Sequence, residues 1–304
     1  MTVQKLRISI VQYLNTAPLV RGFTHGPFAG KYDLSFTVPS QCAEALRTAA
    51  ADIAIIPAIE YQRIPELVVL PGIAIASQNR VRSLLIVSKK PIEQARSIAL
   101  DRSSRSTQAL TRILAAEFWK SDPEFFEAEP DLQAMLDRAD AAMLIGDPAL
   151  RLALAIEKRS TVSPHGRAVC QAATLGITGA EILHVYDVVG EWRRMTGLPA
   201  VMAVWAGKRG VVTPEVLADF SASRDFGLIS IGDICLEAAR ELQLPQAELE
   251  SYLRQNVDFY LHEENRRGLE RYFDEAARLG LIASNKRIAW ASAGVEKAWA
   301  STKP

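Results

Sequence analysis

An apolar strand that runs directly into a polar turn, within LRISIVQYLNTAPLV at residues 6–20, most constrains how this chain can fold. Leu6, Ile8 and Ile10 alternate as the residues of a buried strand do. Pro18 then stands in the first turn of the expected helix, where proline is tolerated. In an open α/β sheet, ligands bind outside the carboxyl ends of the strands. The sequence therefore predicts an α/β fold with a ligand-contacting turn at this position.

Asn15 and Thr16, which occupy this turn, are the first candidate binding residues. Asn15 offers an amide donor and a carbonyl acceptor, and Thr16 adds a hydroxyl. The turn has no glycine-rich cradle for a phosphate group. The alternative is that both side chains merely cap the helix that follows.

The alternation of strands and helices continues along the chain and suggests two lobes. First-lobe strands are expected at residues 7–11, 34–38, 53–56, 68–76 and 201–206, with helices from residue 18 and over 40–50. Second-lobe strands are expected at residues 97–100, 125–128 and 141–145, with helices over 104–119 and 131–138 and from Asp147. Residues 81–87 are extended and lead to the second lobe, whereas 182–188 fits either a strand or a helix edge. The last part is expected to be helical at 214–222, 226–241, 245–256 and 264–279.

Composition limits the classes of partner. The 304 residues are 49 % hydrophobic and 23 % charged, which is typical of a globular protein and long enough for two lobes. The 35 basic side chains balance the 35 acidic ones, so no net field attracts nucleic acid or an anionic membrane. The apolar runs end well before the roughly 20 residues that a membrane span requires. We therefore expect neither a nucleic-acid nor a membrane partner, and composition does not indicate an oligomeric state.

The polar residues near the start and the cysteine pattern favour a cytoplasmic location. Gln12, Asn15 and Thr16 interrupt the first apolar run, which therefore does not fit a signal peptide. The three cysteines are far apart and lack CxxC spacing, as expected for free thiols in a reducing compartment. The four histidines form no metal-binding pattern, and neither a GxGxxG turn nor a P-loop is present. No metal site and no cofactor are expected.

Five phrases of the sequence, taken in order, carry a family resemblance: QYLNTAPL (12–19), DIAIIPAIEY (52–61), NRVRSLLIVSKKPI (79–92), ALDRSSRSTQALTRIL (99–114) and DAAMLIGDPAL (140–150). Together with GEWRRMTGLPAVMAVWAG at 190–207, they resemble the chorismate dehydratase family of the futalosine route to menaquinone. The resemblance extends from about residue 6 to the last helices. The sister enzyme, 1,4-dihydroxy-6-naphthoate synthase, opens with an SPCPNDT turn, where this chain has QYLNTAP. The dehydratase is therefore the expected relative.

This resemblance implies a two-lobed fold of the type II periplasmic-binding-protein kind, with a ligand cleft between the lobes. It places residues 1–88 and 201–304 in the first lobe and residues 89–200 in the second. It implies a lyase that converts chorismate to 3-[(1-carboxyvinyl)oxy]benzoate and water without a cofactor. It also implies that Asn15 and Ser83 are the catalytic residues. Without the resemblance, the preferred role for Ser83 is a hydroxyl that satisfies nearby backbone.

The phrase DRSSRSTQAL is the best anion site in the sequence. Ser104, Ser106 and Thr107 cluster at a helix start, where free N–H groups and the helix dipole favour a carboxylate. Arg102 and Arg105 could add charge-assisted hydrogen bonds. The alternative is that the serines cap the helix and the arginines are solvated.

Glu60, Gly146 and Asp147 also follow expected strands at their carboxyl ends. Glu60 is either a general acid or base or the ion-pair partner of Arg63 or Arg82. Gly146 lets the backbone approach a ligand, although Asp147 as the cap of the next helix explains the same residues.

The competing hypothesis is a solute receptor that binds a small carboxylate and performs no reaction. A two-lobed cleft with an anion site would serve that role as well, because a fold alone does not decide function.

Overall fold

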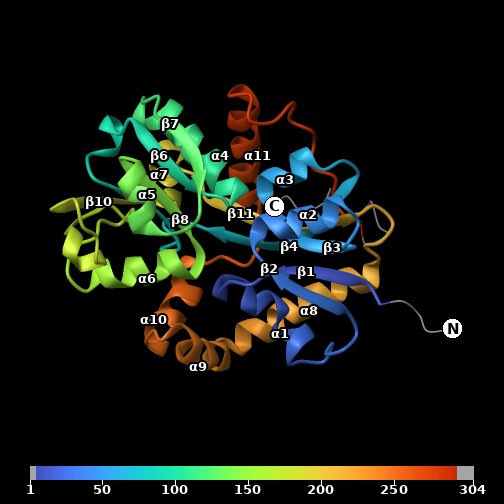
Figure 1. The fold of residues 1–304 in the computed structure, drawn as a ribbon. Helices are drawn as coiled ribbons and strands as arrows, with labels where there is room; N and C mark the ends of the chain where they lie inside the picture. The colour runs from blue at the N-terminus through green and yellow to red at the C-terminus, as the bar shows by residue number, and fades with distance from the viewer. Residues whose placement is uncertain (1–4, 293–304) are drawn as a thin grey trace, which may run out of the picture.

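Two β-sheets form the framework of the computed structural model, which describes residues 5–292. The first sheet contains β1 (Arg7–Val11), β2 (Asp33–Thr37), β3 (Ile53–Pro57), β4 (Leu67–Ser77) and β11 (Ala200–Lys208). The second contains β5 (Leu84–Ser88), β6 (Ser97–Asp101), β7 (Glu124–Ala128), β8 (Ala141–Ile145), β9 (Ala168–Gln171) and β10 (Ile182–Asp187). The strand orders are β2-β1-β3-β11-β4 and β7-β6-β8-β5-β10-β9, and Figure 1 shows the two sheets in separate lobes.

Helices surround both sheets (Figure 1). The helices of the first lobe are α1 (Ala17–Thr24), α2 (Pro39–Arg47), α3 (Ala58–Arg63), α8 (Pro214–Ile229), α9 (Ile231–Leu242), α10 (Gln246–Ser251) and α11 (Glu263–Arg278). Those of the second are α4 (Arg105–Leu114), α5 (Leu132–Arg138), α6 (Gly146–Glu157) and α7 (Val188–Thr196). Short 3₁₀ turns lie at η1 (Leu14–Thr16), η2 (Ile92–Gln94) and η4 (Ala172–Leu175), and π-helical turns at η3 (Ala115–Trp119) and η5 (Tyr252–Asn256).

The central strands are buried on both faces, as their uninterrupted apolar sequences predict. Every residue of β3 and of β8 is buried. β1 pairs in parallel with β2 and β3, and β6 pairs in parallel with β7 and β8. Parallel strands covered by helices on both sides are typically apolar throughout. The mixed α/β character and the two lobes are therefore confirmed.

The structure differs from some of the expected helices and resolves one segment that the sequence left open. The break expected between residues 222 and 226 is absent, because α8 runs through it. The polar side chain of Ser223 there faces inward, where it donates to the Leu19 carbonyl and accepts from the Gly22 N–H. The ambiguous segment 182–188 forms the strand β10, and the helix expected over 104–119 changes to the π-helical turn η3 at Ala115.

The chain crosses between the sheets twice. β4 ends at Ser77 in the first sheet, and β5 begins at Leu84 in the second. Sheet membership thus changes before residue 84, whereas the proposed lobe boundary follows residue 88. β11 returns to the first sheet, as expected for residues 201–206. The ends of the proposed division, residues 1–4 and 293–304, lie outside the described residues.

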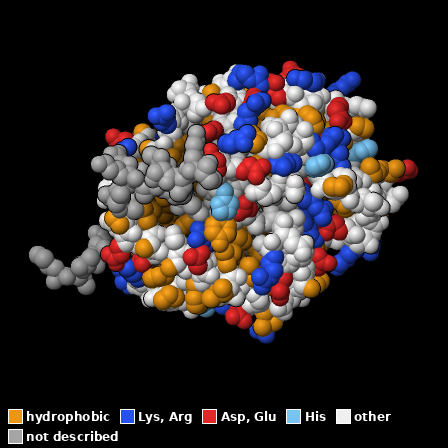
Figure 2. Space-filling model, turned by 180° about the vertical axis from the view of Figure 1, so that it is seen from behind, with side chains coloured by type: hydrophobic (Ala, Val, Ile, Leu, Met, Phe, Trp, Pro, Cys, Tyr) orange, Lys and Arg blue, Asp and Glu red, His pale blue; other side chains and the backbone are white. Residues whose placement is uncertain are grey.

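Charges of both signs are interspersed over the face shown in Figure 2. This distribution matches the balanced composition of the chain. In the part of the chain that the structure describes, no helix is long and apolar enough to cross a membrane.

The contact between α1 and α8 fixes the helix that follows the Asn15 turn, and we predict that Gly227→Ala disrupts it. A Cβ at Gly227 would lie 1.8 Å from the Pro18 carbonyl oxygen, so the two helices must move apart. Overpacking of this kind costs about 1–3 kcal/mol. Chemical denaturation should show this loss in the free energy of unfolding.

Gly232→Ala is the matched control, because a Cβ at this helical glycine meets no atom within 4 Å. It should leave stability unchanged or raise it by up to about 1 kcal/mol. Equal stability of the two variants would contradict the proposed close packing of α1 and α8.

Candidate functional site

Ser83 lies at the first crossing, where both lobes contact it. Its hydroxyl accepts a hydrogen bond from the Tyr252 hydroxyl at 2.8 Å, and its carbonyl accepts from the Gly146 N–H at 2.8 Å. Ser83 is 1 % exposed. The first contact comes from η5 and the second from the start of α6. Ser83 is thus fixed between the lobes.

A buried carboxylate holds the backbone just before Ser83. Asp187, at the end of β10, accepts from the N–H groups of Val81 at 3.0 Å, Arg82 at 2.6 Å and Gly190 at 3.0 Å. Arg82 has a φ of 66°, a left-handed conformation that is uncommon for residues other than glycine. The hydrogen bonds to Asp187 stabilise this turn and therefore determine where Ser83 lies.

Asn15 lies in η1, near the Tyr252 phenol that donates to Ser83. Both polar side chains act to lower the pKa of Tyr252, but burial dominates and raises it well above its ordinary value. Thr16 is the N-cap residue of α1 but makes no side-chain capping bond. The alternative that this turn only caps the helix is therefore wrong.

Gly146 and Asp147 bring the second lobe against the Asn15 turn. A Cβ at Gly146, whose φ is 69°, would lie 2.7 Å from the ring of Tyr13. The Asp147 carboxylate accepts from the Leu14 N–H at 3.1 Å. The expectation that Asp147 caps the next helix is wrong, because α6 begins at Gly146 with Ile145 as its N-cap.

The electrostatic environment of Asp147 favours its neutral form. Burial raises the pKa of Asp147 to about 6, against the opposing effects of the Leu14 N–H and the Arg151 charge. A carboxyl group with this pKa changes its charge near neutral pH.

The hydroxyls of the serine-rich turn already have partners within the protein. Ser104 caps α4 by accepting from the Thr107 N–H at 3.4 Å, and it donates to the Thr107 hydroxyl at 2.8 Å. Ser106 accepts from the N–H of Ile59, a first-lobe residue, at 3.2 Å. The capping role of Ser104 is therefore confirmed, and all three candidates lie buried where the lobes meet.

Asp101 precedes this turn and was not identified from the sequence. Its Oδ1 accepts from the Ser103 hydroxyl at 2.6 Å and from the Ser103 N–H at 2.9 Å. Its Oδ2 is buried and has no hydrogen-bond partner among the described residues. Burial raises the pKa of Asp101 above its ordinary value. The motif DRSS resembles an ordinary helix start, so only the fold shows that this carboxyl group is buried.

Glu60 is fully buried and is committed to ion pairs. Arg63 and Arg105 each donate to its carboxylate at 2.9 Å, and Arg47 also pairs with it. Burial alone would raise the pKa of Glu60, but the arginines outweigh it and hold the pKa below the ordinary value. Of the two expected partners, Arg63 is present, whereas Arg82 pairs with acidic side chains elsewhere, Glu157 and Glu248.

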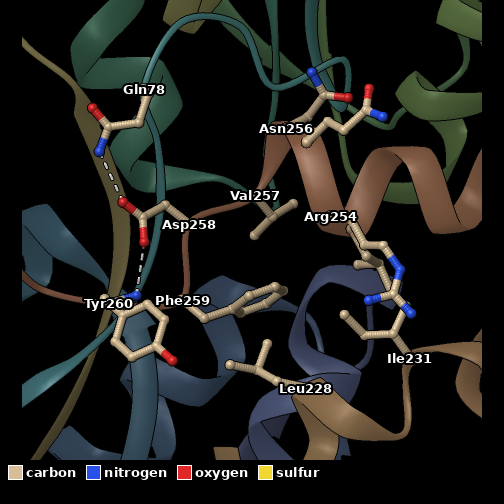
Figure 3. Close-up of a pocket in the computed structure, with 11 residues that line it drawn as sticks. Gln78, Leu228, Ile231, Arg254, Asn256, Val257, Asp258, Phe259 and Tyr260 are labelled. Carbon is tan, nitrogen blue, oxygen red and sulfur yellow. Dashed lines mark hydrogen bonds between the residues drawn. The ribbon is translucent and has the colours of Figure 1, made fainter. Parts of the chain in front are cut away.

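The space around the site is uneven. A cavity of about 310 Å³ borders the turn that contains Asn15 and is lined by Tyr13, Leu14 and, from the second lobe, Asp147. A cavity beside Ser106 and Thr107, also lined by Trp192 and Tyr272, has a volume of about 10 Å³. Ligand pockets usually measure about 300–1,000 Å³. A groove of about 460 Å³ lies beyond η5 (Figure 3), but neither Asn15 nor Ser83 lines it. In the part of the chain that the structure covers, no group of three or more His, Cys, Asp or Glu side chains could hold a metal ion.

Tyr252 is the residue of this site that sequence reasoning missed. It was expected inside the helix over 245–256, where a tyrosine fits an apolar face equally well. Nothing in the local pattern indicates that its hydroxyl meets Asn15 and Ser83. A contact between such distant segments becomes visible only in the folded chain.

Comparison with known proteins links this chain to one family. A family model described as menaquinone biosynthesis matches residues 6–278. A chorismate dehydratase from Thermus thermophilus is 26 % identical over 276 residues, which are 90 % of this chain and 95 % of that protein.

Solved structures confirm the fold. A protein from Archaeoglobus fulgidus matches with a TM-score of 0.69 at 18 % identity, covering 93 % of this chain and 100 % of that one. The periplasmic aliphatic sulphonate binding protein SsuA from Escherichia coli matches with a TM-score of 0.58 at 15 % identity, covering 100 % and 97 %. The fold is thus that of the two-lobed periplasmic binding proteins. Since the family model covers most of the sequence, the chain belongs to the menaquinone biosynthesis family.

Proposed function

We propose that this protein is a chorismate dehydratase, a lyase that converts chorismate to 3-[(1-carboxyvinyl)oxy]benzoate and water. The observation that carries the proposal is that Ser83 accepts from the Tyr252 hydroxyl where the lobes meet, with the Asn15 side chain near enough to influence the same phenol. These are the two residues that the sequence resemblance implies for catalysis. The named relative from Thermus thermophilus supports the same reaction.

The reaction suits a site built from neutral hydrogen-bonding groups. Loss of the ring C3 proton and the C4 hydroxyl makes the ring aromatic, which provides a large driving force. The protein must hold the substrate, orient the leaving hydroxyl and exclude water. Orientation alone can contribute about 7–11 kcal/mol in well-aligned systems. Asn15 and Ser83 orient the reacting part of the ring in this proposal.

The base that removes the C3 proton has three candidates: the substrate's own enolpyruvyl carboxylate, a water held by Asn15, and Glu60. The ion pairs of Glu60 with three arginines, and its lowered pKa, make it a poor base. The proposal therefore retains the first two candidates.

Substrate binding requires the lobes to separate and close again. In this proposal Ser104, Ser106 and Thr107 exchange partners within the protein for a substrate carboxylate. Thr16, Gly146 and Asp147 then close over the ring. Hinge closure around a ligand is common for two-lobed proteins of this kind. The reaction belongs to the futalosine pathway and takes place in the cytoplasm in this proposal.

A solute-binding protein for a small carboxylate is the second candidate. The chain shares its fold with a sulphonate-binding protein, although a shared fold does not decide between the two functions. One result distinguishes the two functions, namely whether bound chorismate is converted to product.

We predict that the purified protein converts chorismate to an aromatic ether lighter by one water. Asn15→Ala and Ser83→Ala should each lower kcat about 10²-fold or more, as the loss of an aligned donor does in other enzymes. Product formation should be followed by mass spectrometry and NMR.

Ser88→Ala is the matched control, because Ser88 is a buried serine at the far end of β5, the strand that begins just after Ser83. It should keep the kcat of the wild type. Bound but unchanged chorismate would support the receptor, and an unchanged kcat in both site variants would contradict the site assignment.

A second prediction concerns Asp147 and pH. The pKa of Asp147 in the folded protein is about 6, above the ordinary value of 3.8, so the folded state binds this proton more tightly than the unfolded state. The stability that the proton confers is complete below pH 3.8 and is lost as the pH rises to about 6. Asp147→Asn cannot ionise and should lack this loss.

Thermal unfolding of both proteins at intervals between about pH 3.5 and 7.5 tests this prediction. The melting temperature of the wild type should fall relative to that of Asp147→Asn across about pH 4–6. Parallel curves would contradict the raised pKa.

A further inference from the structure

The hydroxyl of Tyr252 connects the two residues that the proposed function places at the reacting ring. It donates to the Ser83 hydroxyl at 2.8 Å, and the Asn15 side chain lies near enough to influence the pKa of the phenol. Tyr252 is 1 % exposed. It belongs to η5, a π-helical turn, and such turns are frequent at functional sites.

The backbone of Ser83 is fixed, but a serine hydroxyl can still rotate. Asp187 holds the N–H groups of the two preceding residues, and the Gly146 N–H holds the Ser83 carbonyl. Tyr252 donates to the Ser83 oxygen, so the Ser83 proton must point elsewhere. Burial keeps the Tyr252 phenol protonated at neutral pH, because it raises the pKa of this group. The phenol therefore remains a donor.

Tyr252 is itself anchored to the crossing segment. The Asn256 side chain, at the end of η5, donates to the Arg80 carbonyl at 3.2 Å. Beyond η5, Asp258 pairs with the backbone of Ala76 in β4 and accepts from the Gln78 side chain at 2.8 Å (Figure 3). Tyr252 and Ser83 are therefore attached to the same short stretch of chain.

We propose that Tyr252 is a positioning residue, whose hydroxyl holds the Ser83 hydroxyl as a donor aimed at the leaving oxygen of chorismate. This inference rests on the proposed dehydratase function and adds a third residue to its site. Other tyrosines of the chain are buried, but this one alone among the described residues contacts Ser83 through its hydroxyl.

The step balances without a proton from the protein. The bond from C4 to oxygen breaks and its electron pair stays on the oxygen, while the electron pair of the C3–H bond enters the ring. The C3 proton, carried by the base, completes the water molecule. Ser83 donates a hydrogen bond to the developing charge while Tyr252 donates to Ser83, and neither transfers a net proton, since a buried tyrosinate would be costly.

A double-mutant cycle with chorismate as substrate tests the role of Tyr252. Tyr252→Phe keeps the ring and should lower kcat about 10- to 100-fold, with KM changed less than about threefold, because the interaction strengthens only as charge develops. In the Ser83→Ala background the same change should have little further effect on kcat. Residues that act through one another are not additive.

Tyr61→Phe is the matched control. This buried tyrosine also uses its hydroxyl twice, donating to the Arg287 carbonyl and accepting from the Ala289 N–H, but away from the site. It should keep the kcat of the wild type. A fluorotyrosine at position 252 retains the hydroxyl and should restore kcat to within about threefold of the wild-type value, which a merely structural role for the ring does not predict.

The outcomes separate this inference from the proposed function. A wild type that binds chorismate without converting it overturns the dehydratase and this role together. An active wild type with unchanged kcat in Tyr252→Phe, or with additive losses in the cycle, overturns the role of Tyr252 alone. If Tyr252→Phe does not fold, the fluorotyrosine protein decides, because its kcat should follow the acidity of the phenol.

Discussion

The hydrogen bonds that the Asp187 carboxylate accepts hold the crossing between the lobes in place, and the candidate site depends on them. A buried carboxylate is costly unless donors surround it. Here the N–H groups of Val81, Arg82 and Gly190 provide them. The same turn holds Arg82 in a left-handed backbone conformation, which costs about 1–2 kcal/mol. This arrangement fixes Ser83 where residues of both lobes contact it.

The same region explains why the two lobes lie against each other. Contacts across the lobes use the polar groups that a ligand would use: Leu14 with Asp147, Ile59 with Ser106, and Arg105 with Glu60. Each neutral hydrogen bond contributes only about 0.5–1.5 kcal/mol in net terms, because water replaces it when it opens. A ligand that offers equivalent partners can therefore take the place of these contacts at small cost. In the proposed function, the neutral hydrogen bonds of this set are exchanged for the ligand, whereas the ion pair between Arg105 and Glu60 stays in place.

The sequence predicts those parts of the fold that depend on local patterns. The buried strand β3 and the turn at Asn15 follow from apolar runs and from the residues that end them. The continuity of α8 does not, since Ser223 resembles a loop residue until α1 covers it. The residues of the site also fall into those that a local pattern predicts and those that it does not. Asn15 and Ser83 lie in sequence phrases that are recognisable by themselves. Tyr252 and Asp187 contact residues far away in the chain, and no local sequence pattern predicts such contacts.

The charges of the side chains around the site affect substrate binding and catalysis differently. Asn15, Ser83 and Tyr252 are neutral side chains, while the buried carboxylate of Glu60 is occupied by ion pairs. Because these hydrogen-bond donors are neutral, they do not lose a large hydration energy when a substrate with two carboxylates binds. Neutral donors orient a leaving group well but cannot remove a proton from carbon at neutral pH. For the proposed elimination, the substrate or a water molecule held at the site therefore supplies the base.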